Sequence, residues 1–179
     1  EGLKGFDLKG KTLGVIGAGK IGLHVIRIAK GFGMEVLAYD SFQNNFLAEV
    51  LGFSYASLDD VLKCSDIITL HVPSNSQTIH LINKKNIGRI KKGALLINTS
   101  RGAVVEVDAL LDGLDKGILG GAGLDVIEGE ELIKEEKQIL HEPKSAKALH
   151  QLAKDHILLQ KDNVVFTPHI AFYSQEALE

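Results

Sequence analysis

A glycine-rich turn between two apolar segments constrains the fold of this chain more than any other feature. The turn follows the apolar run 12–16 with the spacing G-x-G-x-x-G, and its glycines are Gly17, Gly19 and Gly22. The run 21–30 has apolar residues at helical spacing, namely Ile21, Val25, Ile28 and Ala29, which predicts a helix. A second strand is predicted over 35–39. Strand, turn, helix and strand in this order predict a βαβ unit with parallel strands.

Each glycine of this turn has a physical reason to be present in a dinucleotide site. The first allows a tight turn, the second lets the backbone approach a pyrophosphate, and the third permits close packing of helix on strand. The start of the helix offers N–H groups and a positive dipole end to the phosphates. Asp40, at the end of the second strand, can accept both hydroxyls of an adenosine ribose and would repel a 2′-phosphate. The sequence therefore favours NAD over NADP as cofactor.

The composition of the 179 residues indicates one soluble globular domain, with 45% hydrophobic residues and a net charge of −3. This mild acidity gives no electrostatic basis for binding nucleic acid or an anionic membrane. No apolar stretch is long enough to cross a bilayer, no signal peptide is recognisable, and the single cysteine cannot form an internal disulfide. A cytoplasmic protein is therefore expected. No pair of His, Cys or Asp has zinc-type spacing, so no metal is expected.

Strands alternate with helices along the rest of the chain. Further strands are predicted over 53–56, 66–72, 94–98, 121–126 and 164–167, and further helices over 46–51, 58–64, 84–91 and 107–116. Because most strands are apolar on both faces, the pattern predicts an α/β fold, a Rossmann-like doubly wound parallel sheet of about seven strands with helices on both faces. The charged segment 128–161 is predicted to be an insertion of one or two exposed helices.

Distinctive polar residues fall where the predicted strands end. Asp40, His71, Asp125 and His169 close or follow four of the strands, and the turn 98–101 follows another. The carboxyl ends of parallel strands lie along one edge of a sheet, where ligands bind, so this placement predicts a site. Each residue also has a structural alternative. Asp125 could cap the next turn, Arg101 could be a surface arginine, and Glu130, in an acidic patch, could be a solvated carboxylate.

Five motifs together resemble the nucleotide-binding domain of the D-isomer-specific 2-hydroxyacid dehydrogenases: GKTLGVIGAGKIG, LHVP, LINTSRG, GAGLDVIEGE and TPHIAFYS. The resemblance implies that Arg101 binds the substrate, that Glu130 is the acidic partner and that His169 is the acid/base. The ending Ala171-Phe172-Tyr173 and the long charged insertion are most similar to the D-lactate dehydrogenase branch. One departure is Glu131, which replaces a proline often found after the acidic residue.

The resemblance also implies a path for the cofactor. Backbone groups of Lys20 and Ile21 would touch the pyrophosphate, and Asp40 would hold the adenosine ribose. The nicotinamide would be oriented by Asp125 and the turn after the fifth strand. The full set implied by resemblance is Gly17, Gly19, Lys20, Ile21, Gly22, Asp40, His71, Val72, Pro73, Thr78, Thr99, Ser100, Arg101 and Asp125.

By resemblance, the expected activity is the reduction of pyruvate by NADH to D-lactate. Two alternatives stay open: another D-2-hydroxy acid such as glycerate, phenyllactate, hydroxyisocaproate or phosphoglycerate, or a non-enzymatic NAD-sensing, corepressor-like binding module. The chain lacks an initial methionine, and residues 1–179 are expected to be an NAD-binding domain without its substrate-binding domain. Such a piece should be inactive alone. Its expected partners are a small 2-oxo or 2-hydroxy acid and a second copy, in a homodimer formed through this domain.

Overall fold

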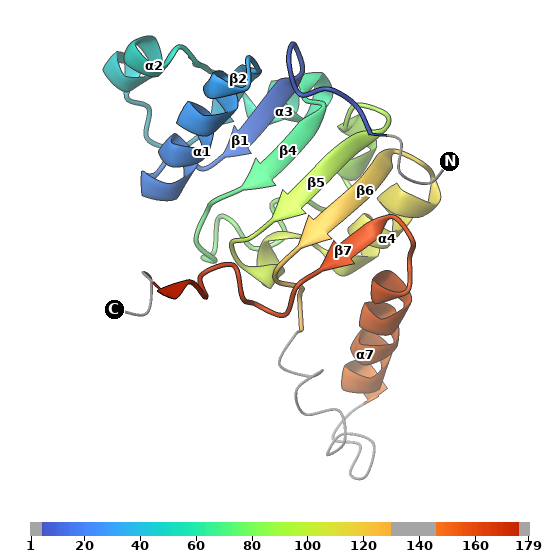
Figure 1. The fold of residues 1–179 in the computed structure, drawn as a ribbon. Helices are drawn as coiled ribbons and strands as arrows, with labels where there is room; N and C mark the ends of the chain where they lie inside the picture. The colour runs from blue at the N-terminus through green and yellow to red at the C-terminus, as the bar shows by residue number, and fades with distance from the viewer. Residues whose placement is uncertain (1–4, 130–145, 176–179) are drawn as a thin grey trace.

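The computed structural model describes residues 5–129 and 146–175, which contain a seven-stranded sheet with the order β3-β2-β1-β4-β5-β6-β7 (Figure 1). Neighbouring strands pair in parallel throughout. The strands are β1 (Thr12–Ile16), β2 (Glu35–Tyr39), β3 (Ser54–Tyr55), β4 (Ile67–Leu70), β5 (Ala94–Asn98), β6 (Leu119–Leu124) and β7 (Val164–Phe166). The predicted doubly wound parallel sheet is confirmed, and the strand order reverses between β1 and β4.

Helices cover the two faces of the sheet in two sets. The helices are α1 (Lys20–Gly31), α2 (Asn45–Leu51), α3 (Leu58–Cys64), α4 (Val107–Asp115) and α7 (Ala146–Leu159), with 3-10 turns η1 (Ile87–Arg89) and η2 (Gly102–Val104). Right-handed crossovers place α1 and α2 on one face and the later helices on the other, because the chain moves in opposite directions from β1. The sheet is thus the middle of three layers.

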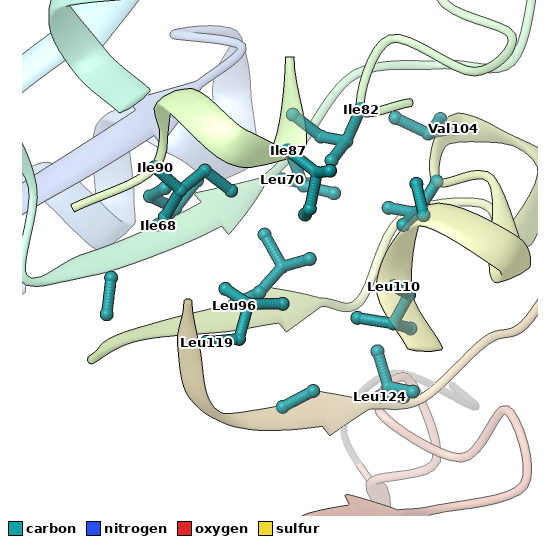
Figure 2. Packing of buried hydrophobic residues seen from close by; sticks show 14 of the residues in the cluster. Ile68, Leu70, Ile82, Ile87, Ile90, Leu96, Val104, Leu110, Leu119 and Leu124 are labelled. Atoms are coloured by element: carbon teal, nitrogen blue, oxygen red, sulfur yellow. The ribbon is translucent and has the colours of Figure 1, made fainter. Parts of the chain in front are cut away.

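Two hydrophobic clusters correspond to these two faces. The smaller one packs α1 and α2 on the first strands and includes Val15, Ile26 and Phe53. The larger one lies on the opposite face, where residues of β4, β5 and β6 meet those of η1, η2 and α4 (Figure 2). Leu70, Leu96 and Leu110 are among its fully or almost fully buried side chains. This packing makes a continuous support below the carboxyl ends of β4, β5 and β6.

The helix predicted over 21–30 is confirmed as α1, and a glycine decides which of its faces is buried. Ile21 and Ile28 are 68% and 56% exposed, whereas Gly22, Ile26 and Ala29 face the sheet. The reason is the close approach of helix and strand at Gly22, where an added Cβ would lie 2.0 Å from the carbonyl oxygen of Gly17. This contact sets the rotation of the helix, and residues one and two turns later then follow it to the sheet.

The helix predicted over 84–91 was wrong, since the structure has only the single 3-10 turn η1 there. Two asparagine side chains account for the difference. Asn83 Oδ1 accepts the Lys85 N–H at 2.9 Å, and Asn86 Oδ1 accepts the Asn83 N–H at 2.9 Å. Such local side-chain bonds satisfy the backbone outside a helix and therefore compete with helix formation.

Two further boundaries differ from the prediction. β6 begins at Leu119 and ends at Leu124, so Asp125 lies just past the strand instead of within it. The segment 128–161 is not simply an exposed insertion, because α7 buries Leu152, Asp155 and Leu158. Residues 130–145, which include Glu130, lie outside the described part of the chain.

Asp155 on α7 is a buried carboxyl with an unusual environment. It is fully buried, Gln151 Nε2 donates to its Oδ1 at 3.0 Å, and its Oδ2 has no hydrogen-bond partner among the described residues. Burial, with a smaller contribution from the charge of Glu128, raises the pKa of Asp155 to about 6, although the Gln151 hydrogen bond opposes the shift.

This raised pKa predicts a pH-dependent stability. Between pH 3.8 and about 6 the folded protein holds a proton on Asp155 that the unfolded chain releases, so the free energy of unfolding falls as pH rises through this window. The free energy of unfolding of Asp155→Asn should therefore rise relative to that of the wild type by about 2–3 kcal/mol between about pH 4 and pH 7. Urea unfolding at several pH values measures this gain, with the exposed Asp162→Asn as control. If the difference in free energy of unfolding between wild type and Asp155→Asn did not change with pH, the raised pKa of Asp155 would be contradicted.

Candidate active site

A cleft of about 220 Å³ lies at the carboxyl ends of β1, β2 and β4, where the strand order reverses. This switch point is the usual ligand position in an open parallel sheet. Many of the predicted cofactor residues line the cleft, namely Gly17, Gly19, Asp40, His71, Val72, Pro73 and Thr78. The structure therefore brings these predicted cofactor residues together in one cleft.

The three glycines of the turn have different surroundings. Gly17 has a φ of +98°, and a Cβ there would lie 2.7 Å from the carbonyl oxygen of His71. Gly22 is held against Gly17 as described above. Around Gly19, by contrast, no described heavy atom lies within 4 Å of the position of a Cβ. Packing within the protein thus requires glycine at positions 17 and 22, whereas Gly19 leaves open space beside the cleft.

The first turn of α1 is suited to an anion. No side-chain hydrogen bond caps this 12-residue helix at Gly19, and its first turn contains no acidic residue. The N–H groups that begin at Lys20 and Ile21 and the positive end of the helix dipole therefore favour a negatively charged group. A pyrophosphate next to the open side of Gly19 fits this arrangement.

Asp40 is fixed by the same turn. Its Oδ2 accepts the Ala18 N–H at 2.7 Å, and its Oδ1 accepts the Phe42 N–H at 2.9 Å. The carboxylate therefore stands in a defined place at the wall of the cleft. Its negative charge there opposes a 2′-phosphate, which supports the preference for NAD.

His71 forms another part of the cleft wall. Its ring Nε2 lies 3.0 Å from the hydroxyl of Thr69, and burial lowers the pKa of the ring below its usual value. A neutral imidazole is therefore favoured beside the cofactor cleft at physiological pH.

The turn that carries Arg101 is built around a buried amide. Asn98, at the end of β5, is 1% exposed, and its Oδ1 accepts both the N–H and the hydroxyl of Ser100. Its Nδ2 donates to the carbonyl oxygen of Arg101 at 3.1 Å. Arg101 itself is exposed, and its Nη1 donates to the Ser100 carbonyl oxygen at 2.7 Å. The predicted site included the turn 98–101 but assigned no role to Asn98, whose side chain organises that turn.

Asp125 holds the segment that carries His169. Its buried carboxylate accepts the Thr167 hydroxyl at 2.6 Å and the N–H groups of Ile170 and Ala171. Burial acts to raise the pKa of Asp125, but these hydrogen bonds and the charge of His169 outweigh it and lower the pKa below its usual range. The structure thus gives this aspartate a positioning contact that the sequence did not reveal.

His169 itself adopts a backbone conformation that is rare for a residue with a side chain. Its φ is +57°, its N–H donates to the Asp125 carbonyl oxygen at 2.8 Å, and its ring meets Phe172 edge to face at 6.0 Å. Strained backbone of this kind persists where surrounding contacts enforce it, and it is concentrated at functional sites.

The sheet brings these elements to one edge. Arg101 follows β5, Asp125 follows β6 and His169 follows β7, and these strands are neighbours. Glu130 lies outside the described residues.

Within the ranges 5–129 and 146–175, no group of three or more His, Cys, Asp or Glu is arranged to hold a metal. No helix in those ranges is long and apolar enough to span a membrane.

A doubly wound sheet with an uncapped glycine turn and an acidic residue at its switch point defines a dinucleotide-binding domain. Residues 1–171 match the family described as D-isomer specific 2-hydroxyacid dehydrogenase, NAD binding domain, and the chain belongs to this family. The cofactor of the domain is accordingly NAD.

Similar proteins include several dehydrogenases and reductases. The structure of a D-lactate dehydrogenase from Aquifex aeolicus, complexed with NAD and lactic acid, is 43% identical with a TM-score of 0.88, over 99% of this chain and 52% of that one. The D-specific alpha-keto acid dehydrogenase of Enterococcus faecalis is 44% identical, over 98% of this chain and 50% of its own length. An aromatic 2-oxoacid reductase of Clostridium sporogenes is 41% identical, over 99% of this chain and 51% of its own length. The chain spans about half the length of these relatives.

The different surroundings of Gly19 and Gly22 predict different effects of adding one methyl group. Gly22→Ala should lower the free energy of unfolding by about 1–3 kcal/mol, because the new Cβ meets backbone. Gly19→Ala should change stability by less than about 0.5 kcal/mol. It should nevertheless weaken NADH binding by at least about 10-fold, because the methyl group enters the space next to the pyrophosphate. Urea unfolding and fluorescence titration with NADH measure the two quantities. Unchanged NADH affinity in Gly19→Ala would refute the cofactor path.

Proposed function

We propose that this chain is the cofactor-binding part of an NAD-dependent D-2-hydroxyacid dehydrogenase, and that the full-length enzyme reduces pyruvate to D-lactate. The observation that carries the proposal is the position of Arg101, Asp125 and His169 at the ends of three adjacent strands, on the edge that also forms the NAD cleft. Family membership and the similarity to a D-lactate dehydrogenase with bound NAD and lactic acid support it.

In this proposal the cofactor extends along the edge of the sheet. Asp40 holds the adenosine ribose, and the start of α1 at Lys20 and Ile21 holds the pyrophosphate. Val72, Pro73 and Thr78 form the adenine side of the cleft. Thr99, Ser100 and Asp125 stand at the nicotinamide end. When bound, NADH supplies the hydride for C2 of the substrate.

The chain's own residues bind and protonate the substrate. Arg101 presents a planar fork of donors to the carboxylate and the 2-oxo group, which orients the substrate and polarises its carbonyl. His169 carries the proton that goes to the oxygen at C2 as that oxygen gains negative charge. Glu130 is proposed as the carboxylate that favours the protonated ring. Reduction therefore requires protonated His169, and the reverse oxidation requires the neutral ring.

Other 2-oxo acids are the second candidate substrates. The Clostridium sporogenes relative is named an aromatic 2-oxoacid reductase and is nearly as similar to this chain as the D-lactate dehydrogenase. Pyruvate and an aromatic 2-oxo acid share the carboxylate and carbonyl that Arg101 would bind, and they differ only in the group attached to C2. The same catalytic edge therefore serves either substrate.

We also propose that the remainder of the full-length protein covers the open face of β5, β6 and β7. On the face that α1 shares, Val165 is 69% exposed, and Leu95 and Ile97 are only half-buried beside an open hollow. Parallel sheets are normally buried on both faces. Since the relatives are about twice as long as this chain, their additional length is the natural source of that cover and of the opposite wall of the active site.

The assigned roles predict the effects of two substitutions in the full-length enzyme. Arg101→Ala and His169→Ala should each lower kcat/KM for pyruvate reduction by at least about 100-fold, because orientation and proton donation each contribute on that scale. The affinity for NADH should change little. NADH oxidation in the presence of pyruvate measures the activity. Arg89→Ala, which removes an exposed arginine paired with Asp59 at 2.8 Å, is the control. Near-normal turnover in either active-site variant would exclude the assigned role.

A panel of pyruvate, phenylpyruvate and glyoxylate tests the substrate. The proposal expects the highest kcat/KM with pyruvate, by at least about 10-fold, since a poorly fitting side chain costs about 1–3 kcal/mol of transition-state binding. A preference for phenylpyruvate would select the aromatic alternative. NADH binding without turnover of any 2-oxo acid would instead indicate a binding module.

A further inference from the structure

His80 and Glu128 form a pair that the proposed chemistry does not use. They are 48 residues apart in sequence, yet the ring Nε2 of His80 lies 2.5 Å from Oε1 of Glu128. Their side chains are 40% and 27% exposed, so the contact is partly shielded from solvent. A carboxylate only accepts hydrogen bonds, and the ring nitrogen is therefore the donor.

The second oxygen of Glu128 reaches the start of α4. Its Oε2 accepts the N–H of Val107 at 3.2 Å, which is the first residue of that helix. Glu106, at the N-cap of α4, makes no side-chain capping bond. Glu128 therefore supplies from a distant loop the acceptor and the negative charge that a helix start favours.

Both members of the pair also contact the segment between Arg101 and α4 through their backbones. The N–H of His80 donates to the carbonyl oxygen of Ala103 at 2.8 Å. Gly102 is packed so closely on the turn after β6 that a Cβ would lie 2.0 Å from the Ile127 oxygen and 2.7 Å from the Glu128 nitrogen. The segment 101–107 is thus hydrogen-bonded to His80 at Ala103 and to Glu128 at Val107.

The backbone of His80 shows that surrounding contacts impose its position. Its φ is +51°, and its carbonyl oxygen accepts Asn83 Nδ2 at 2.7 Å. Its neighbours Thr78 and Leu81 line the NAD cleft. His80 therefore connects the wall of the cofactor cleft to the segment that begins with Arg101.

We propose that His80 and Glu128 are positioning residues that fix Arg101 relative to the cofactor. The inference rests on the proposed role of Arg101 in binding the 2-oxo acid. Neither residue touches the reacting atoms; they act by holding segment 101–107 between the cleft wall and the turn after β6. Loss of the pair lets the guanidinium move with respect to the nicotinamide end of the cleft, while Asp40 and the start of α1, which hold the adenosine ribose and the pyrophosphate in the proposal, stay in place.

The test compares substitutions of His80 and Glu128 in the full-length enzyme, with pyruvate as the probe. His80→Ala and Glu128→Ala should each lower kcat/KM for pyruvate by about 10–100-fold, because small misplacement of a binding group costs this much. The loss should appear mainly as a raised KM for pyruvate, with the Kd for NADH changed by less than about 3-fold because the adenosine and pyrophosphate contacts remain. The double variant should be no worse than Glu128→Ala alone, since His80→Ala removes only a side-chain contact that Glu128→Ala has already removed.

Two further variants distinguish positioning from general stability. His80→Gln keeps an N–H donor and should stay within about 3-fold of wild-type kcat/KM, because a side-chain amide can replace the imidazole as a donor. Lys84→Met removes a 2.8 Å ion pair between the same loop and Asp108 of α4 without touching the 101–107 backbone. It should leave the KM for pyruvate unchanged.

The outcomes separate the positioning role of His80 and Glu128 from the proposed role of Arg101. Unchanged pyruvate KM in His80→Ala and Glu128→Ala, while Arg101→Ala is inactive, would overturn the positioning role alone. Parallel loss of NADH affinity and thermal stability, in His80→Gln as well, would also overturn it. Full activity in Arg101→Ala would overturn the proposed function itself.

Discussion

The close approach of α1 to β1 is the contact on which the cofactor half of this protein depends. Only glycine can occupy position 22, because the helix lies directly on the carbonyl group of Gly17. That contact rotates α1, aims its uncapped N-terminus along the edge of the sheet and leaves Gly19 next to open space. One backbone-to-backbone contact thereby determines the shape of the turn and the place where a pyrophosphate can bind.

The half that carries the proposed catalytic residues is organised by a different kind of interaction. Buried polar side chains, Asn98 and Asp125, each satisfy several groups of a loop that follows a strand. Such contacts are strong in a buried environment, and they are costly to break because they leave unpaired groups behind. They fix the backbone around Arg101 and His169 relative to the sheet, although both residues lie in loops.

The two halves are physically connected through the parallel sheet and through the pair His80–Glu128. Parallel strands send all their carboxyl ends to one edge, which brings the NAD cleft and the proposed catalytic residues into one line. The His80–Glu128 contact ties the loop beside that cleft to the segment that begins with Arg101. Such a direct connection would hold the proposed substrate-binding arginine in register with the cofactor.

The sequence by itself determined the strand positions, the glycine turn and the polar residues at strand ends, because these follow from local patterns of apolar residues and glycine. Only the tertiary structure decided which face of α1 is buried, since the contact at Gly22 turns Ile26 toward the sheet and leaves Ile21 and Ile28 exposed. It also replaced the expected helix near Asn86 with a turn, and it gave Asn98, Asp125, His80 and Glu128 their partners. The contacts of Asp125 with Thr167 and Ile170 and of His80 with Glu128 join residues far apart in the chain, which leave no local pattern, so only the packed fold could bring them together. The bonds around Asn86 and Asn98 are local, but their geometry became visible only in the folded chain.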